Sequence, residues 1–352
     1  MPRPALGKRP HRLRFVLFRH DRDARTGWVS YGRAMEQHGH GHGHGHGQKQ
    51  DHDQEAWGDA DLAVMLDLDA EVLRDQLHKV TGEIAAVAGE RVPRRVLDLG
   101  AGTGSGTFAL LRRFPAAHVT AVDVSPVMLQ RLRAAVGELG AQVEILAADL
   151  DAGWPALDTT VDGGVGDALD GVSEGAALDL VWAAASLHHV ADPDRVLRDV
   201  AAALRPGGLL TLLEMDSFPR FLPDAVGDGF EARVHAALRG VQVEVVPHFG
   251  TDWGPRLAAA GFTVEVAREV TLDLPAPSRP LPEASGRYAQ VFLRRVRTGL
   301  TGLAEADVAP SDLLQFDVLL ADDGPDSLLH RDDLVVRATR SLWIARTGST
   351  VG

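Results

Sequence analysis

Short apolar runs and longer segments of helical pattern alternate along the middle of the chain. Within the longer segments apolar residues recur every three to four positions, which is typical of amphipathic helices packed on strands. The predicted strands are residues 94–100, 118–124, 142–150, 177–186 and 209–216. The predicted helices between them are residues 105–114, 125–140 and 192–208. This order predicts an α/β fold with a parallel sheet and helices on both of its faces.

Residues that favour helix ends support two of these helices. The helix at 125–140 begins with Ser125 as N-cap and Pro126 in its first turn, and it has a glycine at its exit. A hydroxyl at the N-cap accepts a hydrogen bond from a free backbone N–H group, and proline needs no such partner there. The helix at 192–208 is expected to end at its Pro-Gly-Gly sequence.

Weaker patterns flank this central part on both sides. Apolar residues recur at helical spacing in residues 57–90. The stretch from Asp67 to Asp69 is expected to divide the segment into two helices. Later helices are predicted at 230–240, 252–262, 284–300 and 311–320, the last capped by Ser311, and strands at 263–272 and 334–346.

The patterns predict five parts of the chain. They are a disordered basic arm with a His-Gly tract at 1–56, a helical lid at 57–93, the core domain at 94–272, a helical cap insertion at 273–333, and the last strand of the core with a tail at 334–352. Residues 1–34 carry nine Lys or Arg against two Asp. We interpret them either as a disordered arm or as residues upstream of a true start at Met35.

Composition excludes several classes of function. A formal net charge of -13 disfavours nucleic acids and anionic membranes as partners. The chain has no cysteine, which excludes disulfides, thiolate nucleophiles and cysteine-based metal sites. No apolar run approaches the roughly 18 residues that span a bilayer. We therefore expect a cytoplasmic protein that acts on a small molecule, and the sequence leaves its oligomeric state open.

Five His-Gly pairs follow the basic segment, with imidazoles at His38, His40, His42, His44 and His46. Alternating glycines cannot build a core, so low complexity is the simpler interpretation of this tract. Neutral imidazoles two residues apart can also chelate zinc, nickel or copper weakly. No metal site is expected in the core.

The sequence "VLDLGAGTGSG" at 96–106 follows the first predicted strand and points to a nucleotide-like ligand. A phosphate P-loop needs a Gly-Lys-Ser/Thr ending, which is missing here, and the G-x-G-x-x-G spacing of dinucleotide sites also fails. Asp98 is expected beside the ligand, where its carboxylate would repel a pyrophosphate. It would suit a cationic ligand without phosphate, such as S-adenosylmethionine, whose carboxylate would meet the helix N-terminus at Ser105.

These residues resemble the class I S-adenosylmethionine-dependent methyltransferases. "VLDLGAGTG" is similar to the first motif of the family, "AVDVSPVML" at 121–129 to the second, and "AADL" at 147–150 to the adenine-binding element. Residues 178–214 resemble the subgroup that methylates small molecules. The resemblance implies a seven-stranded, doubly wound sheet with an antiparallel last strand. It also implies ribose binding by Asp123 and adenine binding by Asp149. The implied cofactor-binding residues are Asp98, Gly100, Ala101, Gly102, Thr103, Gly104, Asp123, Val124, Met128, Asp149, Leu150 and Ala183.

Methyl transfer from a sulfonium needs close approach and desolvation, and an oxygen or carbon acceptor can also need a general base. The candidates are His188 and His189 after the fourth strand and Glu214 at the end of the fifth. O- or C-methylation of a small molecule is the favoured function. Two alternatives stay open: an NAD(P)-dependent oxidoreductase, and a metal-binding protein with a vestigial methyltransferase domain.

The segment after the fifth strand is expected to cover the ligand cleft. Most of its aromatic residues are expected in the core and a few in a pocket wall; they are Phe218, Phe221, Phe230, Trp253, Tyr288 and Phe292. Arg287, Arg294, Arg295 and Arg297 lie on one predicted helix, where a solvated basic face is favoured over a clamp for a substrate carboxylate.

Overall fold

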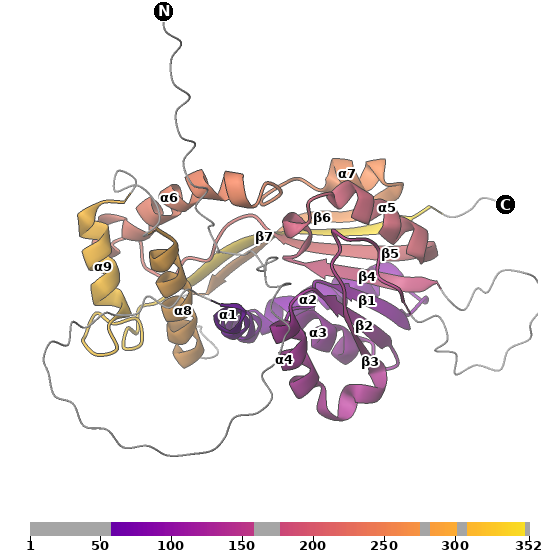
Figure 1. The fold of residues 1–352 in the computed structure, drawn as a ribbon, viewed down its shortest axis with the longest axis horizontal. Helices are drawn as coiled ribbons and strands as arrows, with labels where there is room; N and C mark the ends of the chain where they lie inside the picture. The colour runs from indigo at the N-terminus through magenta and orange to yellow at the C-terminus, as the bar shows by residue number, and fades with distance from the viewer. Residues whose placement is uncertain (1–57, 158–176, 275–281, 301–307, 349–352) are drawn as a thin grey trace, which may run out of the picture.

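The computed structural model describes residues 58–157, 177–274, 282–300 and 308–348. One sheet holds seven strands in the order β3-β2-β1-β4-β5-β7-β6, which confirms the predicted doubly wound fold (Figure 1). The strands are β1 (Arg95–Leu99), β2 (His118–Asp123), β3 (Val143–Ala147), β4 (Leu178–Ala184), β5 (Leu204–Met215), β6 (Phe262–Leu274) and β7 (Val336–Thr347). Because β7 pairs antiparallel with both β5 and β6, the other six strands run in one direction.

Helices cover both faces of the sheet because its strands are apolar on both sides. One face packs on α5 (Pro193–Ala203) and α7 (Gly254–Ala259), through strand residues such as Leu97. The opposite face packs on α2 (Arg74–Ala88) and α3 (Ser105–Arg113), through residues such as Val96. Neighbouring residues of β1 thus point to opposite layers, as the two-residue period of a strand requires.

The predicted start of the helix at 125–140 is confirmed, whereas the predicted ends of this helix and of the helix at 192–208 are wrong. In α4 (Pro126–Val136) the Ser125 side chain accepts a hydrogen bond from the backbone N–H of Met128, and the helix ends at Gly137. Helix α5 instead ends at Ala203, before the Pro-Gly-Gly sequence. Leu204 already pairs with Leu178 of β4, so pairing in the sheet takes these residues from the helix.

The N-terminal segment forms two helices, but they do not divide at the predicted aspartates. Helix α1 (Asp59–Val72) continues through Asp67 and Asp69, and the break lies at Leu73. Both aspartates point away from their own backbone, because Asp67 pairs with Arg131 and Asp69 pairs with Arg340. Neither carboxylate therefore competes for the backbone hydrogen bonds of the helix.

The cap is built by α6 (Phe230–Val245), α8 (Pro282–Leu300) and α9 (Pro310–Leu320), and Figure 1 shows α8 and α9 at one end of the molecule. The ring centroids of Phe230 in α6 and Phe316 in α9 lie 4.8 Å apart, edge to face. Tyr288 in α8 packs edge to face on Phe221 of the segment before α6, with ring centroids 5.0 Å apart. In agreement with the sequence, Phe218, Phe221, Phe230, Trp253, Tyr288 and Phe292 are all buried.

Two expectations for the cap helices are wrong. Helix α9 begins at Pro310 after Ala309 and has no side-chain cap, so Ser311 is not its N-cap. Arg295 is only 3% exposed, so the arginines of α8 do not form one solvated face. Burial lowers the pKa of Arg295 to about 10, and the nearby Asp61 and Asp59 oppose this shift. Arg295 thus lies on the side of α8 that packs against α1.

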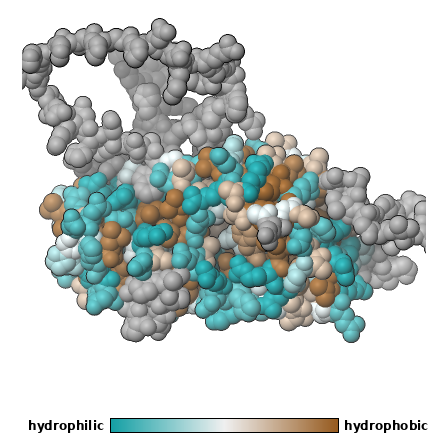
Figure 2. Space-filling view, turned by 90° about the horizontal axis from the view of Figure 1, so that it is seen from below, coloured by the Kyte–Doolittle hydropathy of each residue, from teal (hydrophilic) through white to brown (hydrophobic). Residues whose placement is uncertain are grey.

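The face of the molecule seen in Figure 2 is mainly polar, with apolar patches between the polar residues. Helix α9 exposes Leu314 and Val318, which lie one helical turn apart on the same face. Within the described ranges, no helix combines the length and the apolar character needed to cross a membrane.

Candidate functional site

A cavity of about 490 Å³ lies at the carboxyl ends of the parallel strands, which is where open α/β sheets bind ligands. The turn after β1 and the ends of β2, β4 and β5 form its base, while α1 and α8 contribute side chains from the lid and the cap. Its volume falls within the range of about 300–1,000 Å³ that is usual for small-molecule sites.

The glycine turn gives the cavity a wall made of backbone. Gly100, Gly102 and Gly104 all have positive φ angles, of 69°, 55° and 97°. A Cβ atom on Gly100 would lie 2.4 Å from Cβ of Ser186, and one on Gly104 would lie 2.3 Å from Cδ1 of Leu132. Only glycine therefore allows the close packing of the turn against the segment after β4 and against α4.

The first turn of α3 leaves backbone donors at this wall. Its N-cap is Gly104, which supplies no side-chain acceptor, and Thr103 and Ser105 both line the cavity. Free N–H groups at a helix N-terminus favour anionic groups. The backbone N–H groups of this turn thus fit the carboxylate of an amino-acid ligand, and no lysine or arginine side chain is needed to bind it.

Asp123 joins the ends of β1 and β2. Its Oδ2 accepts a hydrogen bond of 2.8 Å from the backbone N–H of Gly102, and its Oδ1 accepts one of 2.8 Å from that of Ser125. The side chain is buried, yet it lines the cavity. Asp123 therefore holds the glycine turn in place and presents negative charge to whatever the turn binds.

The end of the cavity beside the glycine turn, where the sequence predicts a cofactor and which we call the cofactor end, carries three carboxylates in all, because Asp149 and Asp151 line it beyond β3 (Val143–Ala147). A pyrophosphate in this low-dielectric space would meet strong repulsion. The cluster instead suits ribose hydroxyls, an exocyclic amine or an ammonium group, all of which donate hydrogen bonds.

Asp98 does not lie where the sequence analysis expects it, since it is not among the described residues that line the cavity. It is 1% exposed, and its Oδ2 accepts a hydrogen bond of 2.6 Å from the hydroxyl of Thr107 in α3. Burial raises the pKa of Asp98 from 3.8 to about 7; the Thr107 hydrogen bonds lower it, and the charge of Asp123 raises it. Asp98 thus braces α3 from behind the glycine turn.

This shift predicts a dependence of stability on pH. Between pH 3.8 and about 7 the folded protein keeps a proton on Asp98 that the unfolded chain releases. The stabilisation is therefore complete below the unfolded pKa and is lost as pH rises through the folded pKa. From pH 5 to pH 8 we expect the free energy of unfolding of the wild type to fall by about 2.7 kcal/mol relative to Asp98→Asn.

Urea unfolding of both proteins at several pH values measures this difference. Other buried titratable groups, such as Glu231 and His235, are present in both proteins and cancel in the comparison. Parallel stability profiles from pH 5 to pH 8 would show that Asp98 titrates normally.

His188 and Glu214 form a buried pair beside the cavity. Nδ1 of His188 lies 2.5 Å from Oε2 of Glu214, and both side chains are at most 3% exposed. Oε1 of Glu214 accepts hydrogen bonds from the backbone N–H groups of Ser186, at 3.2 Å, and Leu187, at 2.9 Å. The pair thus holds the turn after β4, and neither residue is among the described residues that line the cavity.

His189 is the one of the three candidate bases that the structure places in the described cavity wall. It belongs to the short 3-10 helix η4 (Leu187–His189), and its ring centroid lies 4.2 Å from that of His188. The neighbouring Ala185 has a positive φ of 47°, which is rare for alanine. After this turn the neighbouring side chains of His188 and His189 have different surroundings: the first is buried against Glu214, and the second lines the cavity.

The far end of the cavity holds a charged group that the sequence analysis misses. Nη2 of Arg340 in β7 lies 2.8 and 2.7 Å from the two carboxylate oxygens of Asp69 in α1. The hydroxyl of Tyr288 in α8 donates to Oδ1 of Asp69 at 2.6 Å. Burial, with the nearby Asp69, raises the pKa of Tyr288 well above its usual value.

Most of the predicted cofactor residues line the one cavity. They are Gly100, Ala101, Gly102, Thr103, Asp123, Val124, Met128, Asp149 and Leu150. Gly104 and Ala183, like Asp98, are not among the described lining residues. The wall also contains lid residues that no motif indicated, namely Leu62, Met65, Leu66 and Asp69. The apolar residues of α1 that pack in the core and those that line the cavity have the same character in the sequence. The sequence therefore does not distinguish the two groups.

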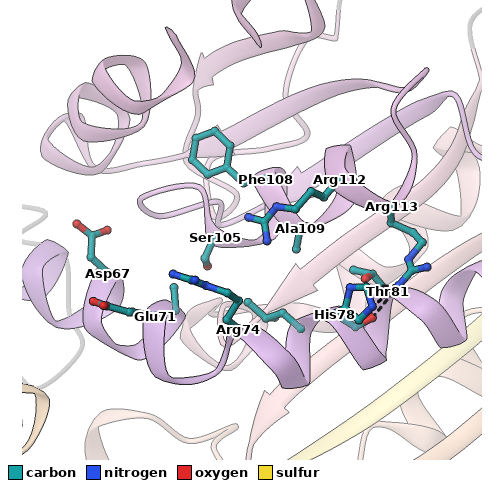
Figure 3. A pocket seen from close by; sticks show the side chains of 12 residues that line it. Asp67, Glu71, Arg74, His78, Thr81, Ser105, Phe108, Ala109, Arg112 and Arg113 are labelled. Carbon is teal, nitrogen blue, oxygen red and sulfur yellow. Dashed lines mark hydrogen bonds between the residues drawn. The ribbon is translucent and has the colours of Figure 1, made fainter. Parts of the chain in front are cut away.

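A second cavity, of about 360 Å³, lies between α2 and α3 (Figure 3). Figure 3 shows the guanidinium groups of Arg74 and Arg112 directed toward the space beside Ser105. Asp67 and Glu71 line the same cavity, so its charges are mixed. It lacks the glycine wall and the strand ends of the larger cavity, which we take as the functional site.

The histidine tract that the sequence identifies as a possible weak chelator lies outside the described residues. Among the residues that the structure does describe, no group of three His, Asp or Glu side chains is arranged to hold a metal ion.

Comparison with known proteins connects this geometry to a family of enzymes. Residues 97–210 match the family model described as a methyltransferase domain. Trans-aconitate 2-methyltransferase of Azoarcus sp. is 32% identical over 156 residues, which cover 44% of this chain and 49% of that protein. The 27-O-demethylrifamycin SV methyltransferase of Amycolatopsis mediterranei is 27% identical over 76% of this chain and 84% of its own length.

Among solved structures, phosphoethanolamine N-methyltransferase 2 of Haemonchus contortus, in complex with S-adenosyl-L-methionine, is 15% identical with a TM-score of 0.40. The match covers 78% of this chain and 53% of that one. The chain spans only about half the length of the trans-aconitate relative.

Proposed function

Because the chain belongs to the class I S-adenosylmethionine-dependent methyltransferase family, we propose that it transfers a methyl group to an oxygen or carbon of a small-molecule acceptor. The observation that carries this proposal is the cavity itself, in which a wall of glycine backbone faces three carboxylates. An amino-acid and nucleoside cofactor without phosphate fits that combination, whereas a dinucleotide does not.

When bound, S-adenosylmethionine supplies a methyl group that is already activated by its sulfonium charge. The residues of the chain bind and orient it. The first turn of α3 is placed to receive the cofactor's carboxylate, Asp123 to accept from ribose hydroxyls, and Asp149 to accept from the adenine amine. In this assignment Asp123 keeps its bond to Gly102, which couples binding of the ribose to the shape of the turn.

The acceptor occupies the part of the cavity between η4 and the cap. Apolar side chains from Met65, Met215 and Phe292 line this part and exclude water from it. His189 lies in the same wall and is our candidate for holding or removing a proton from the accepting atom. His188 is the positioning residue, since its bond to Glu214 supports the turn that carries His189.

The test uses the full-length protein, S-adenosylmethionine and a panel of metabolites that includes organic acids, phenols and enolisable ketones. Release of S-adenosylhomocysteine with at least one acceptor is the expected result, and calorimetry should show binding of S-adenosylhomocysteine but not of NADH. Binding of NADH, or the lack of any S-adenosylhomocysteine binding at millimolar concentration, would reject the proposal in favour of its rivals.

A further inference from the structure

The charges of the cavity are distributed unevenly between its two ends. Asp123, Asp149 and Asp151 lie at the cofactor end. At the other end lies Arg340, the only lysine or arginine among the described residues of the cavity wall, together with Asp69, with which it forms an ion pair. An anionic group on a ligand therefore has one cationic partner available in this wall, far from the cofactor end.

The sheet sets the distance between these ends. Strand β7 lies three positions from β1 in the strand order, across β4 and β5. At a strand spacing of about 4.8 Å, Arg340 is roughly 14 Å across the sheet from the glycine turn. Arg340 pairs in register with Met215, whose side chain also lines the cavity. The arginine thus marks the acceptor end.

The contacts of Arg340 leave part of its guanidinium group available. Both hydrogen bonds to Asp69 use Nη2. Within the described ranges Nε and Nη1 make no hydrogen bond, yet neither is one of the buried atoms without a partner. These two donors are therefore not fully buried, and Arg340 lines the cavity. The hydroxyl of Tyr288, in contrast, is already committed to Asp69.

We propose that Arg340 binds a carboxylate of the methyl acceptor through these remaining donors, so that the substrates are small carboxylic acids. This inference rests on the proposed function. Asp69 and Tyr288 act as positioning residues, because they hold the guanidinium group of β7 against α1 and α8. Charge-assisted hydrogen bonds in a largely apolar wall discriminate strongly between an acid and its uncharged amide.

The experiment measures binding to the full-length protein saturated with S-adenosylhomocysteine. Calorimetric titrations compare benzoate with benzamide and glutarate with glutaramide. We expect each acid to bind at least tenfold more tightly than its amide. Arg340→Met should remove this preference and leave the dissociation constant of S-adenosylhomocysteine within twofold of wild type. Arg340→Lys should keep part of the preference.

Two further variants separate recognition from folding. Arg287→Met removes an exposed arginine of α8 and should behave like wild type. The double variant Asp69→Asn with Arg340→Met avoids leaving Asp69 without its cation, and it should fold but show no preference for acids. It covers the case in which Arg340→Met alone is unstable.

The outcomes distinguish this inference from the proposed function. If the wild type fails to bind S-adenosylhomocysteine, the proposed function fails and the inference falls with it. If S-adenosylhomocysteine binds, but no acid binds more tightly than its amide, or the Arg340 variants keep the wild-type preference, the inference alone is overturned.

Discussion

Replacement of Asp123 by alanine is expected to raise the dissociation constant for S-adenosylhomocysteine at least a hundredfold. The carboxylate accepts hydrogen bonds from the buried N–H groups of Gly102 and Ser125. Leaving a buried donor without its partner costs about 1–3 kcal/mol. If the turn must be ordered before it binds the ligand, the cost of two such donors weakens binding, and it suffices to raise the dissociation constant by about two orders of magnitude. Loss of the proposed contact to the ribose adds to this effect.

Calorimetry with purified variants gives the dissociation constant directly. Asp123→Asn should be less damaging, because the amide oxygen can still accept from one of the two N–H groups. Asp199→Ala, which removes a carboxylate paired with Arg195 on the surface of α5, is the matched control and should bind like wild type. An Asp123→Ala protein that is folded and binds within threefold of wild type would contradict the assignment of the cofactor end.

Glu214→Leu is expected to lower the free energy of unfolding by about 3–5 kcal/mol, because it leaves three buried donors without an acceptor at about 1–3 kcal/mol each. The substitution leaves His188 Nδ1 and the backbone N–H groups of Ser186 and Leu187 without their acceptor in a buried place. Urea unfolding followed by circular dichroism measures the loss.

Glu214→Gln keeps one carbonyl oxygen for the two backbone donors, so a loss of less than half as much is expected. A second comparison uses His188→Phe, which removes the imidazole and retains the carboxylate. If Glu214→Leu destabilises the protein by less than 1 kcal/mol, the pair does not support the turn after β4.

The sheet was predictable because each of its elements carries a local pattern. Alternating strands and helices around the glycine turn, with Ser125 as a cap, determine a right-handed parallel arrangement. The ends of elements were less accessible, because tertiary pairing overrides local preference. Residues 204–208 form part of β5 although Pro-Gly-Gly favours a turn, and α1 continues through two aspartates whose partners lie elsewhere in the chain.

The cofactor end was predictable from motifs, and the acceptor end was not. Asp123 and Asp149 each follow a strand, so their place at the cavity follows from the topology alone. Asp69 and Arg340 are 271 residues apart in sequence, and nothing local to either indicates the other. The orientation of side chains was also hidden: His188 and His189 are neighbours, yet only the second is in the described wall.

The place of β7 in the sheet also determines the order in which the molecule can assemble. In the described sheet β6 is an edge strand that pairs with β7 alone, and the cap helices α8 and α9 lie between the two strands in sequence. Strands β1 to β5 can pair as soon as they are synthesised, whereas β6 must wait until residues 275–335 have been made and Val336–Thr347 follows. Closing so long a loop carries an entropic cost that local pairing avoids. During synthesis the apolar edge of β5 therefore stays open until β7 arrives, and the same strand then brings Arg340 to the cavity.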